Sequence, residues 1–203
     1  EIDKKDVRIG DTVVIQRAGA VIPEVVRGLP ERRTGKEKKF RMPDRCPVCG
    51  SEVFRPEGEA VARCMGIACP AQVKETIIHF ASRDAMNIQG LGMKIIEQLV
   101  DRGLIKDYAD LYRLTLDQML TLERMGPKLA GNILTAIQNS KKTTLDRVIY
   151  ALGVLHVGEH VAKLIAQEFS TAEELAEASL ERLTAIRGIG EEIASSMVKF
   201  FQQ

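Results

Sequence analysis

The sequence has few of the features that mark several common classes of protein. No apolar run approaches the ~20 residues of a membrane-spanning helix, and the first residues lack the basic start and apolar stretch of a signal peptide. The net charge is only +1, so the total charge indicates no polyanionic partner. With three histidines, the chain presents neither a catalytic triad nor paired carboxylates with evident partners. Its 203 residues, 45% of them hydrophobic, suffice for one or two domains or for several small modules.

Charge is unevenly distributed despite the near-neutral total. Between residues 27 and 45, eight basic residues stand against only three acids. The basic residues are Arg27, Arg32, Arg33, Lys36, Lys38, Lys39, Arg41 and Arg45. Such a stretch is either a solvated connector or a contact for a polyanion.

The segments on the two sides of this connector differ in their pattern of apolar residues. Residues 7–26 are β-branched and apolar, and they predict strands near Thr12–Arg17 and Val21–Val26, joined at Ala18–Ala20. Two strands are marginal alone, so these need further partners. From residue 73 onward the apolar period is helical. Capping boxes at 115–118 and 171–174 predict two helix starts.

The four cysteines fall in two pairs, Cys46-x2-Cys49 and Cys64-x4-Cys69, fourteen residues apart. Paired thiols at this spacing favour a metal site over a disulfide pair or buried thiols. Four cysteine ligands suit tetrahedral zinc and leave no open position, so the expected role is structural. The metal would replace the core that about thirty residues cannot build.

The helical part contains one motif four times. The copies are "IQGLGMKIIEQL", "LERMGPKLAGNI", "VLHVGEHVAKLI" and "IRGIGEEIASSM", aligned on Gly92, Gly126, Gly158 and Gly190. Apolar residues recur four and one positions before each of these glycines and three and seven positions after it. The pattern predicts a helix, a tight glycine-bearing hairpin and a second helix, with the apolar residue before the glycine tucked between the helices.

The expected chemistry of each copy is the binding of an anion. The glycine is expected to permit a turn that a side chain would block, and to leave the amides of the second helix exposed. Such amides, together with the helix dipole, bind anions. The site would be shallow, and the flanking sequence has no βαβ pattern, so a single backbone phosphate fits better than a dinucleotide.

The copies differ in the residues that would grip a phosphate. Gly90 and Gly188 supply a first glycine in copies one and four, where copies two and three have Arg124 and His156. Two residues past the aligned glycine stand Lys94, Lys128, His160 and Glu192 in turn. The copies are therefore expected to bind phosphate unequally. The fourth copy is expected either to bind less tightly than Gly90–Gly92 or to serve mainly to complete the symmetry of the domain. The alternative is that these are helix pairs for packing or protein contact, with glycines that serve only the turn.

In combination these features resemble the bacterial NAD-dependent DNA ligase family over nearly the whole chain. The resemblance rests on the cysteine spacing, on "CPVCGSEV", "LERMGPKLAGNIL" and "ALGVLHVGEHVAKLIA", and on "VRIGDTVVIQRAGAVIPEVV" upstream. It implies a mostly α chain with a small β portion. Residues 1–40 would be the last strands of an OB-fold domain plus the basic linker, 41–72 a four-cysteine zinc finger, and 73–203 a DNA-binding domain of four helix-hairpin-helix repeats.

The family resemblance also implies partners and a division of labour. Family members seal nicks in duplex DNA during replication and repair, after forming a lysine adenylate in a Lys-x-Asp-Gly motif that this chain lacks. The chain would thus clamp nicked double-stranded DNA without sequence specificity and without catalysis of its own. NAD and Mg²⁺ would bind outside it, and structural zinc within it. A cytoplasmic, nucleoid-associated monomer without membrane contact is expected.

Two questions stay open at this level. A non-catalytic zinc and helix-hairpin-helix DNA-binding scaffold is the alternative to a ligase, and the residues upstream of Glu1 would separate the two. His79 lies in an apolar helix pattern that indicates a structural role. His156 and His160 border a hairpin, and the sequence does not decide whether they contact phosphate.

Overall fold

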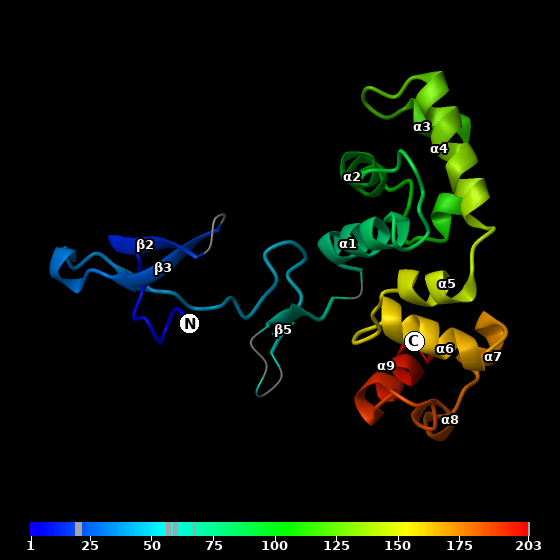
Figure 1. Cartoon of the computed structure of the whole chain (residues 1–203). Helices are drawn as coiled ribbons and strands as arrows, with labels where there is room; N and C mark the ends of the chain where they lie inside the picture. Colours follow the sequence, from blue (N-terminus) through cyan, green and yellow to red (C-terminus); the bar gives the residue numbers. More distant parts are fainter. Residues whose placement is uncertain (19–21, 56–57, 59–60, 67, 203) are drawn as a thin grey trace. The chain divides into compact units, whose positions relative to one another are not determined.

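The structure is a computed structural model and describes residues 1–18, 22–55, 58, 61–66 and 68–202. The chain forms two compact units, Glu1–Met65 and Gly66–Gln203. Short strands make up the first unit, and helices make up most of the second (Figure 1). The predicted mostly α fold with a small β portion is confirmed.

The first unit begins with two antiparallel ribbons. Strand β1 (Arg8–Ile9) pairs with β4 (Lys38–Lys39), and β2 (Val13–Ala18) pairs with β3 (Ile22–Gly28). The register of the second ribbon shifts between Val14 and Ile15. The two predicted strands are therefore present, although β3 runs two residues further than expected. Of the predicted connection, residues 19–21 lie outside the described part.

The basic connector is partly folded rather than a free linker. It contains a short 3-10 helix, η1 (Pro30–Arg32), and strand β4. The Arg33 guanidinium donates to both carboxylate oxygens of Asp11, each at 2.8 Å. The Asp11 side chain has no exposed surface, and its Oδ2 also accepts the Arg8 amide at 2.8 Å. These hydrogen bonds, those from Arg33 first, lower the pKa of the Asp11 carboxyl to about 2.

A third ribbon completes the first unit. Strands β5 (Val53–Phe54) and β6 (Arg63–Cys64) pair antiparallel, and an isolated bridge joins Arg45 to Glu52. This ribbon follows the first cysteine pair and carries the third cysteine.

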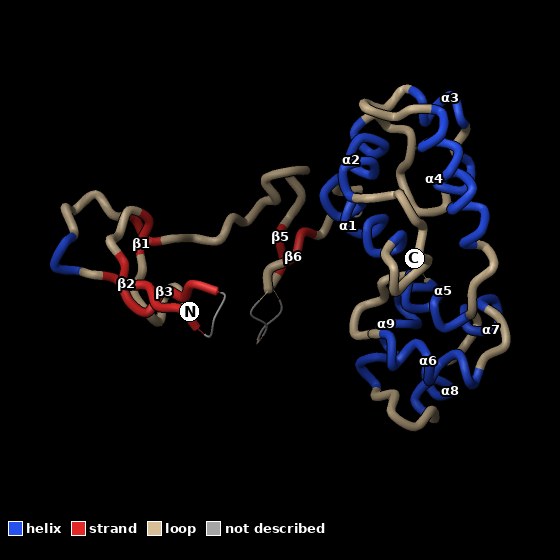
Figure 2. Tube along the Cα trace, turned by 45° about the horizontal axis from the view of Figure 1, so that its top comes forward, coloured by secondary structure: helices blue, strands red, loops and turns tan. Residues whose placement is uncertain are grey.

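Helices and a short 3-10 helix, in two groups, build the second unit (Figure 2). The first group consists of α1 (Pro70–Ala81), α2 (Met93–Asp101), η2 (Asp110–Arg113), α3 (Leu116–Leu120) and α4 (Pro127–Ser140). The second consists of α5 (Leu145–Ala151), α6 (Glu159–Glu168), α7 (Ala172–Ala176), α8 (Leu180–Thr184) and α9 (Glu191–Phe201).

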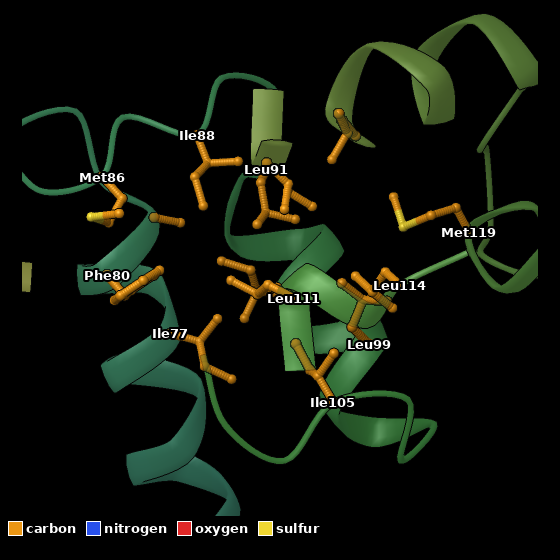
Figure 3. Packing of buried hydrophobic residues seen from close by; sticks show 14 of the residues in the cluster. Ile77, Phe80, Met86, Ile88, Leu91, Leu99, Ile105, Leu111, Leu114 and Met119 are labelled. Carbon is orange, nitrogen blue, oxygen red and sulfur yellow. The ribbon is translucent and has the colours of Figure 1, made fainter. Parts of the chain in front are cut away.

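Each group has a core of its own. In the first, Ile77 of α1, Leu99 of α2 and Leu111 of η2 are fully buried and point toward one another (Figure 3). In the second, Ile165 of α6 and Met197 of α9 are fully buried. Burial of each such side chain contributes about 1.5–3 kcal/mol, so these contacts stabilise the packing of the helices in each group.

Two hydrogen bonds join the groups across α1 and α5. His79 Nε2 lies 2.7 Å from the Tyr150 carbonyl oxygen, and the two rings meet edge to face. Arg147 Nη2 donates to the Arg83 carbonyl at 2.6 Å. The position of His79 agrees with the structural role expected for it.

The capping boxes are right in one case and incomplete in the other. Thr115 and Gln118 exchange both hydrogen bonds at the start of α3. At α7, Thr171 accepts the Glu174 amide at 3.1 Å, but the Glu174 carboxylate accepts the amide of Ser170 at 2.9 Å. The reciprocal bond therefore falls one residue early, where Glu174 is also held by Arg182 at 2.6 Å.

Candidate functional site

The four cysteines converge on one point. The sulfur atoms of Cys46, Cys49, Cys64 and Cys69 all lie within 4.8 Å of one another. The Cys49 and Cys64 sulfurs are 3.4 Å apart, well beyond the ~2.05 Å of a disulfide bond. Tetrahedral zinc at ~2.3 Å from each sulfur requires sulfur–sulfur distances of about 3.8 Å, so the group fits this metal. The cysteines are placed to hold structural zinc.

A tight turn presents the first cysteine pair. The Cys46 amide donates to Ser51 O at 2.7 Å, and the Gly50 amide donates to Cys46 O at 2.9 Å. Gly50 has φ +72°, which glycine adopts without strain. Backbone hydrogen bonds from Cys49, and then from Val48, lower the pKa of the Cys46 thiol. A lowered pKa favours the thiolate that binds metal.

The four copies of the helical motif share one backbone geometry. We refer to residues 88–92, 122–126, 154–158 and 186–190 as turns 1 to 4. The glycine that ends each turn is the N-cap of the next helix, α2, α4, α6 or α9. Its φ/ψ angles are −85°/169° at Gly92, −91°/162° at Gly126, −84°/177° at Gly158 and −84°/168° at Gly190. Two residues earlier the backbone is left-handed in every turn, with φ of +84° at Gly90, +58° at Arg124, +66° at His156 and +94° at Gly188.

This geometry corrects the expected role of the last glycine. At Gly92 and its three counterparts, φ and ψ are ordinary for any residue, and an added Cβ would meet nothing within 4 Å. The expectation that this glycine is needed for the turn was wrong. The turn bends at the earlier, left-handed residue, where Gly90 and Gly188 also lie against Ile133 and Leu164. The last glycine instead keeps open space beside the helix start.

The first amides of these helices are open to a ligand. None of the four glycine-capped helices receives a side-chain cap. In contrast, α3, α7 and α8 are capped by the hydroxyls of Thr115, Thr171 and Ser179. Among the described residues, the amides of Met93 and Lys94 donate no hydrogen bond. The positive end of the helix dipole is therefore open to an anion. Turn 2 offers one amide fewer because α4 begins with Pro127.

The apolar positions behind each turn are mostly where the pattern placed them. The residues before the glycines are buried, namely Leu91, Met125, Val157 and Ile189. Those seven after the glycines are fully buried, namely Leu99, Ile133, Ile165 and Met197. The third position after the glycine is less deeply placed, and Leu129 there is 41% exposed. The fourth position is fully buried in all copies, at Ile96, Ala130, Ala162 and Ala194. A helical period of 3.6 residues indicates the fourth position, but small alanines hide the signal.

The side chains two residues past the glycines differ in charge. Lys94, Lys128 and His160 are exposed, and neither lysine has an ion-pair partner among the described residues. Glu192 instead contacts His156 of turn 3, with 3.1 Å between Nε2 and Oε1. Turns 1 and 2 thus present free cations beside the open amides, and turn 4 presents a carboxylate.

In the described residues, no helix combines the length and the apolar character that crossing a membrane requires.

Family models match four stretches of the chain. They are the NAD-dependent DNA ligase OB-fold domain at residues 1–37, the NAD-dependent DNA ligase C4 zinc finger domain at 45–71, a SAM-like helix-hairpin-helix tandem at 82–139, and a helix-hairpin-helix motif at 147–203. Turns 1 and 2 fall in the tandem, and turns 3 and 4 fall in the last match.

Proteins similar to this chain are named DNA ligase. The chain is 55% identical over 202 residues to one from Geobacter sulfurreducens, 54% over 202 residues to one from Syntrophus aciditrophicus, and 55% over 204 residues to one from Nitrosococcus oceani. Each alignment covers 100% of the chain but only 30% of the relative.

Proposed function

Because the chain belongs to the NAD-dependent DNA ligase family, we propose that it is the DNA-clamping C-terminal region of such an enzyme. In this role it holds nicked duplex DNA by the backbone while other parts of the ligase join the strands. Those parts bind NAD and Mg²⁺ and carry the adenylated lysine. The complete enzyme works as a cytoplasmic, nucleoid-associated monomer in replication and repair.

One observation carries the proposal. At Gly92, Gly126, Gly158 and Gly190 the fold does not require glycine, yet glycine stands there each time beside unpaired helix amides. Because the fold does not require glycine at these positions, we infer that the open space beside each glycine admits a ligand. A phosphate oxygen suits the site because the amides and the helix dipole offer positive charge at the bottom of an open space. Each turn then binds one backbone phosphate.

Binding through backbone phosphates explains why a ligase can act at any DNA sequence. Phosphate contacts set the position of a protein on the duplex but read no base. Turn 1, with two glycines and Lys94, binds most strongly, and turn 4, with two acids in the first turn of α9, binds least. Zinc held by the four cysteines supports the small ribbon module structurally.

The proposed boundaries follow the same division. Residues 1–40 form the end of the OB-fold domain with its linker, residues 41–72 the zinc finger, and residues 73–203 the domain of four helix-hairpin-helix repeats. The exposed apolar side chains of Ile9, Ile15 and Ile22 support an origin in a larger sheet, because a two-stranded ribbon cannot cover them.

The direct test is binding of this chain to a nicked duplex, measured by fluorescence anisotropy at several salt concentrations. The affinity should fall steeply with salt and not depend on sequence. Gly92→Ala should weaken binding about tenfold through crowding of amide–phosphate hydrogen bonds. The matched control is Gly131→Ala within α4, where a Cβ also meets nothing. Salt-independent binding, or equal effects of both substitutions, would overturn the proposal.

A further inference from the structure

A second candidate site for an anion lies beside turn 1. A cleft of about 450 Å³ opens in the helical unit. The segment that joins α4 to α5, which can be followed in Figure 1, forms part of its lining. Its walls come from the segment that leads into turn 1 together with Gln89 of that turn, from the end of α4, from residues 142–144, and from Arg147 of α5. The polar side chains that matter here are those of Asn87, Gln89, Asn139, Lys142, Thr144 and Arg147.

The cleft is positive and contains hydrogen-bonding groups that are not yet used. Two of its lining residues, Lys142 and Arg147, are cations, and none is an acid. Among the described residues, the side chains of Asn87, Asn139 and Thr144 form no hydrogen bond. In a chain whose net charge is +1, an acid-free cleft with two cations is a local concentration of positive potential.

Arg147 is held in place for such a contact. Its Nη2 donates to the Arg83 carbonyl at 2.6 Å, which orients the guanidinium while leaving other N–H groups for a ligand. Glu159 is close enough to interact with Arg147 but is bound by Lys163 at 2.7 Å. A guanidinium with fixed orientation matches the geometry of a phosphate better than a mobile ammonium does.

The lining also limits the kind of ligand. It includes no aromatic ring, and its apolar members are Met86 and Ala136. A nucleotide base would have no platform for stacking, whereas a phosphate needs only cations and hydrogen-bond donors. The cleft therefore suits a phosphodiester rather than a nucleotide.

We propose that this cleft binds a backbone phosphate of the same duplex that turn 1 contacts. Gln89 lines the cleft and directly precedes Gly90 of turn 1, so one backbone can run from the open amides of α2 into the cleft. The inference rests on the proposed function and adds a contact from side chains. It makes the segment between α4 and α5 part of the DNA-binding surface.

The test compares Lys142→Glu with Lys141→Glu in the same chain. Both make the same charge change at adjacent exposed positions, but the Lys141 ammonium lies 5.4 Å from the Tyr112 ring centroid and does not line the cleft. Lys142→Glu should weaken binding to a nicked duplex about tenfold and reduce the slope of log K against log salt by about 0.9. Lys141→Glu should change the affinity much less. Circular dichroism should show both variants folded.

A second arm identifies the contact directly. Single neutral methylphosphonate linkages are placed in turn along the duplex. At one position the linkage should lower the affinity of the unmodified chain but should not lower the affinity of the Lys142→Glu variant any further. The proposal for the cleft would be overturned if both lysine variants weakened binding equally. It would also be overturned if the effects of the linkage and of Lys142→Glu on affinity added up at every position. Neither result would contradict phosphate binding by the turns. Loss of the Gly92→Ala effect, or absence of binding by the unmodified chain, would overturn the proposed function itself.

Discussion

His156 Nε2 and Glu192 Oε1 lie 3.1 Å apart and join turn 3 to the first turn of α9. Glu192 stands where turns 1 and 2 have lysine, and its carboxylate faces a histidine whose backbone is left-handed. The fourth helix start thus already has an acidic side chain nearby, which competes with an incoming phosphate. The acidic side chain at the fourth helix start therefore contacts turn 3 and disfavours an anionic ligand.

Removal of the Glu192 charge should therefore improve DNA binding rather than impair it. Glu192→Ala is expected to tighten binding about two- to fivefold, because an anion near a helix start is replaced by a neutral group. Gly190→Val should weaken binding, and Gly92→Val should weaken it more. Anisotropy titrations at fixed salt would measure all three. A large loss on Glu192→Ala would show that its contact with His156 matters more than charge repulsion.

Zinc should be present at one ion per chain, as measured by elemental analysis. Cys49→Ser should abolish it, because three thiolates and a hydroxyl make a much poorer site than four thiolates. The ellipticity at 222 nm should stay largely unchanged, since none of the four cysteines belongs to either helical core. A purified chain without zinc, or a full loss of helical signal in the variant, would contradict this assignment.

The Asp11 carboxyl should titrate far below its ordinary range as long as Arg33 is present. Its pKa of about 2 means that it contributes stability at pH values above about 4, and that this contribution is lost as the pH falls toward 2. Arg33→Met should raise the pKa toward the ordinary ~3.9. Carbon-13 NMR of the side-chain carboxyl would follow the change. Arg32→Met is the control, because Arg32 is exposed and takes no part in this pair; equal shifts in both variants would refute the assigned cause.

The chain should form no covalent AMP adduct when it is incubated with labelled NAD. The Lys-x-Asp-Gly motif in which the family carries its adenylate is absent from these 203 residues. Gel electrophoresis would detect an adduct, with a ligase that carries the Lys-x-Asp-Gly motif as the positive control. A labelled band from this chain would contradict the proposed division of labour.

Much of this molecule could be predicted because the governing interactions are local. Cys46 and Cys49 are separated by only two residues in a tight turn, so their sulfurs can share one metal wherever the turn lies. Thr115 and Gln118 cap a helix through bonds that span three residues. Leu99 lies seven residues after Gly92, two helical turns along, and is buried as the period requires.

Other features depend on residues that only folding brings together. Asp11 and Arg33 are 22 residues apart, and nothing in the basic stretch distinguishes Arg33 from Arg32. The cleft beside turn 1 is lined by Gln89 from the first group of helices and by Arg147 from the second. No local rule predicts such a meeting, because it depends on how whole helices pack.

The helix pairs, the metal ligands and the repeated glycine could be predicted from the sequence, since each is encoded by spacing along a few turns of chain. The role of the glycines, in contrast, depends on the folded backbone and its surroundings. Backbone angles placed the bend at residue 90 and its counterparts, and left Gly92 and its counterparts with open space and unpaired amides. A glycine in a sequence can mean a bend or a missing side chain, and only its φ angle and its surroundings distinguish the two.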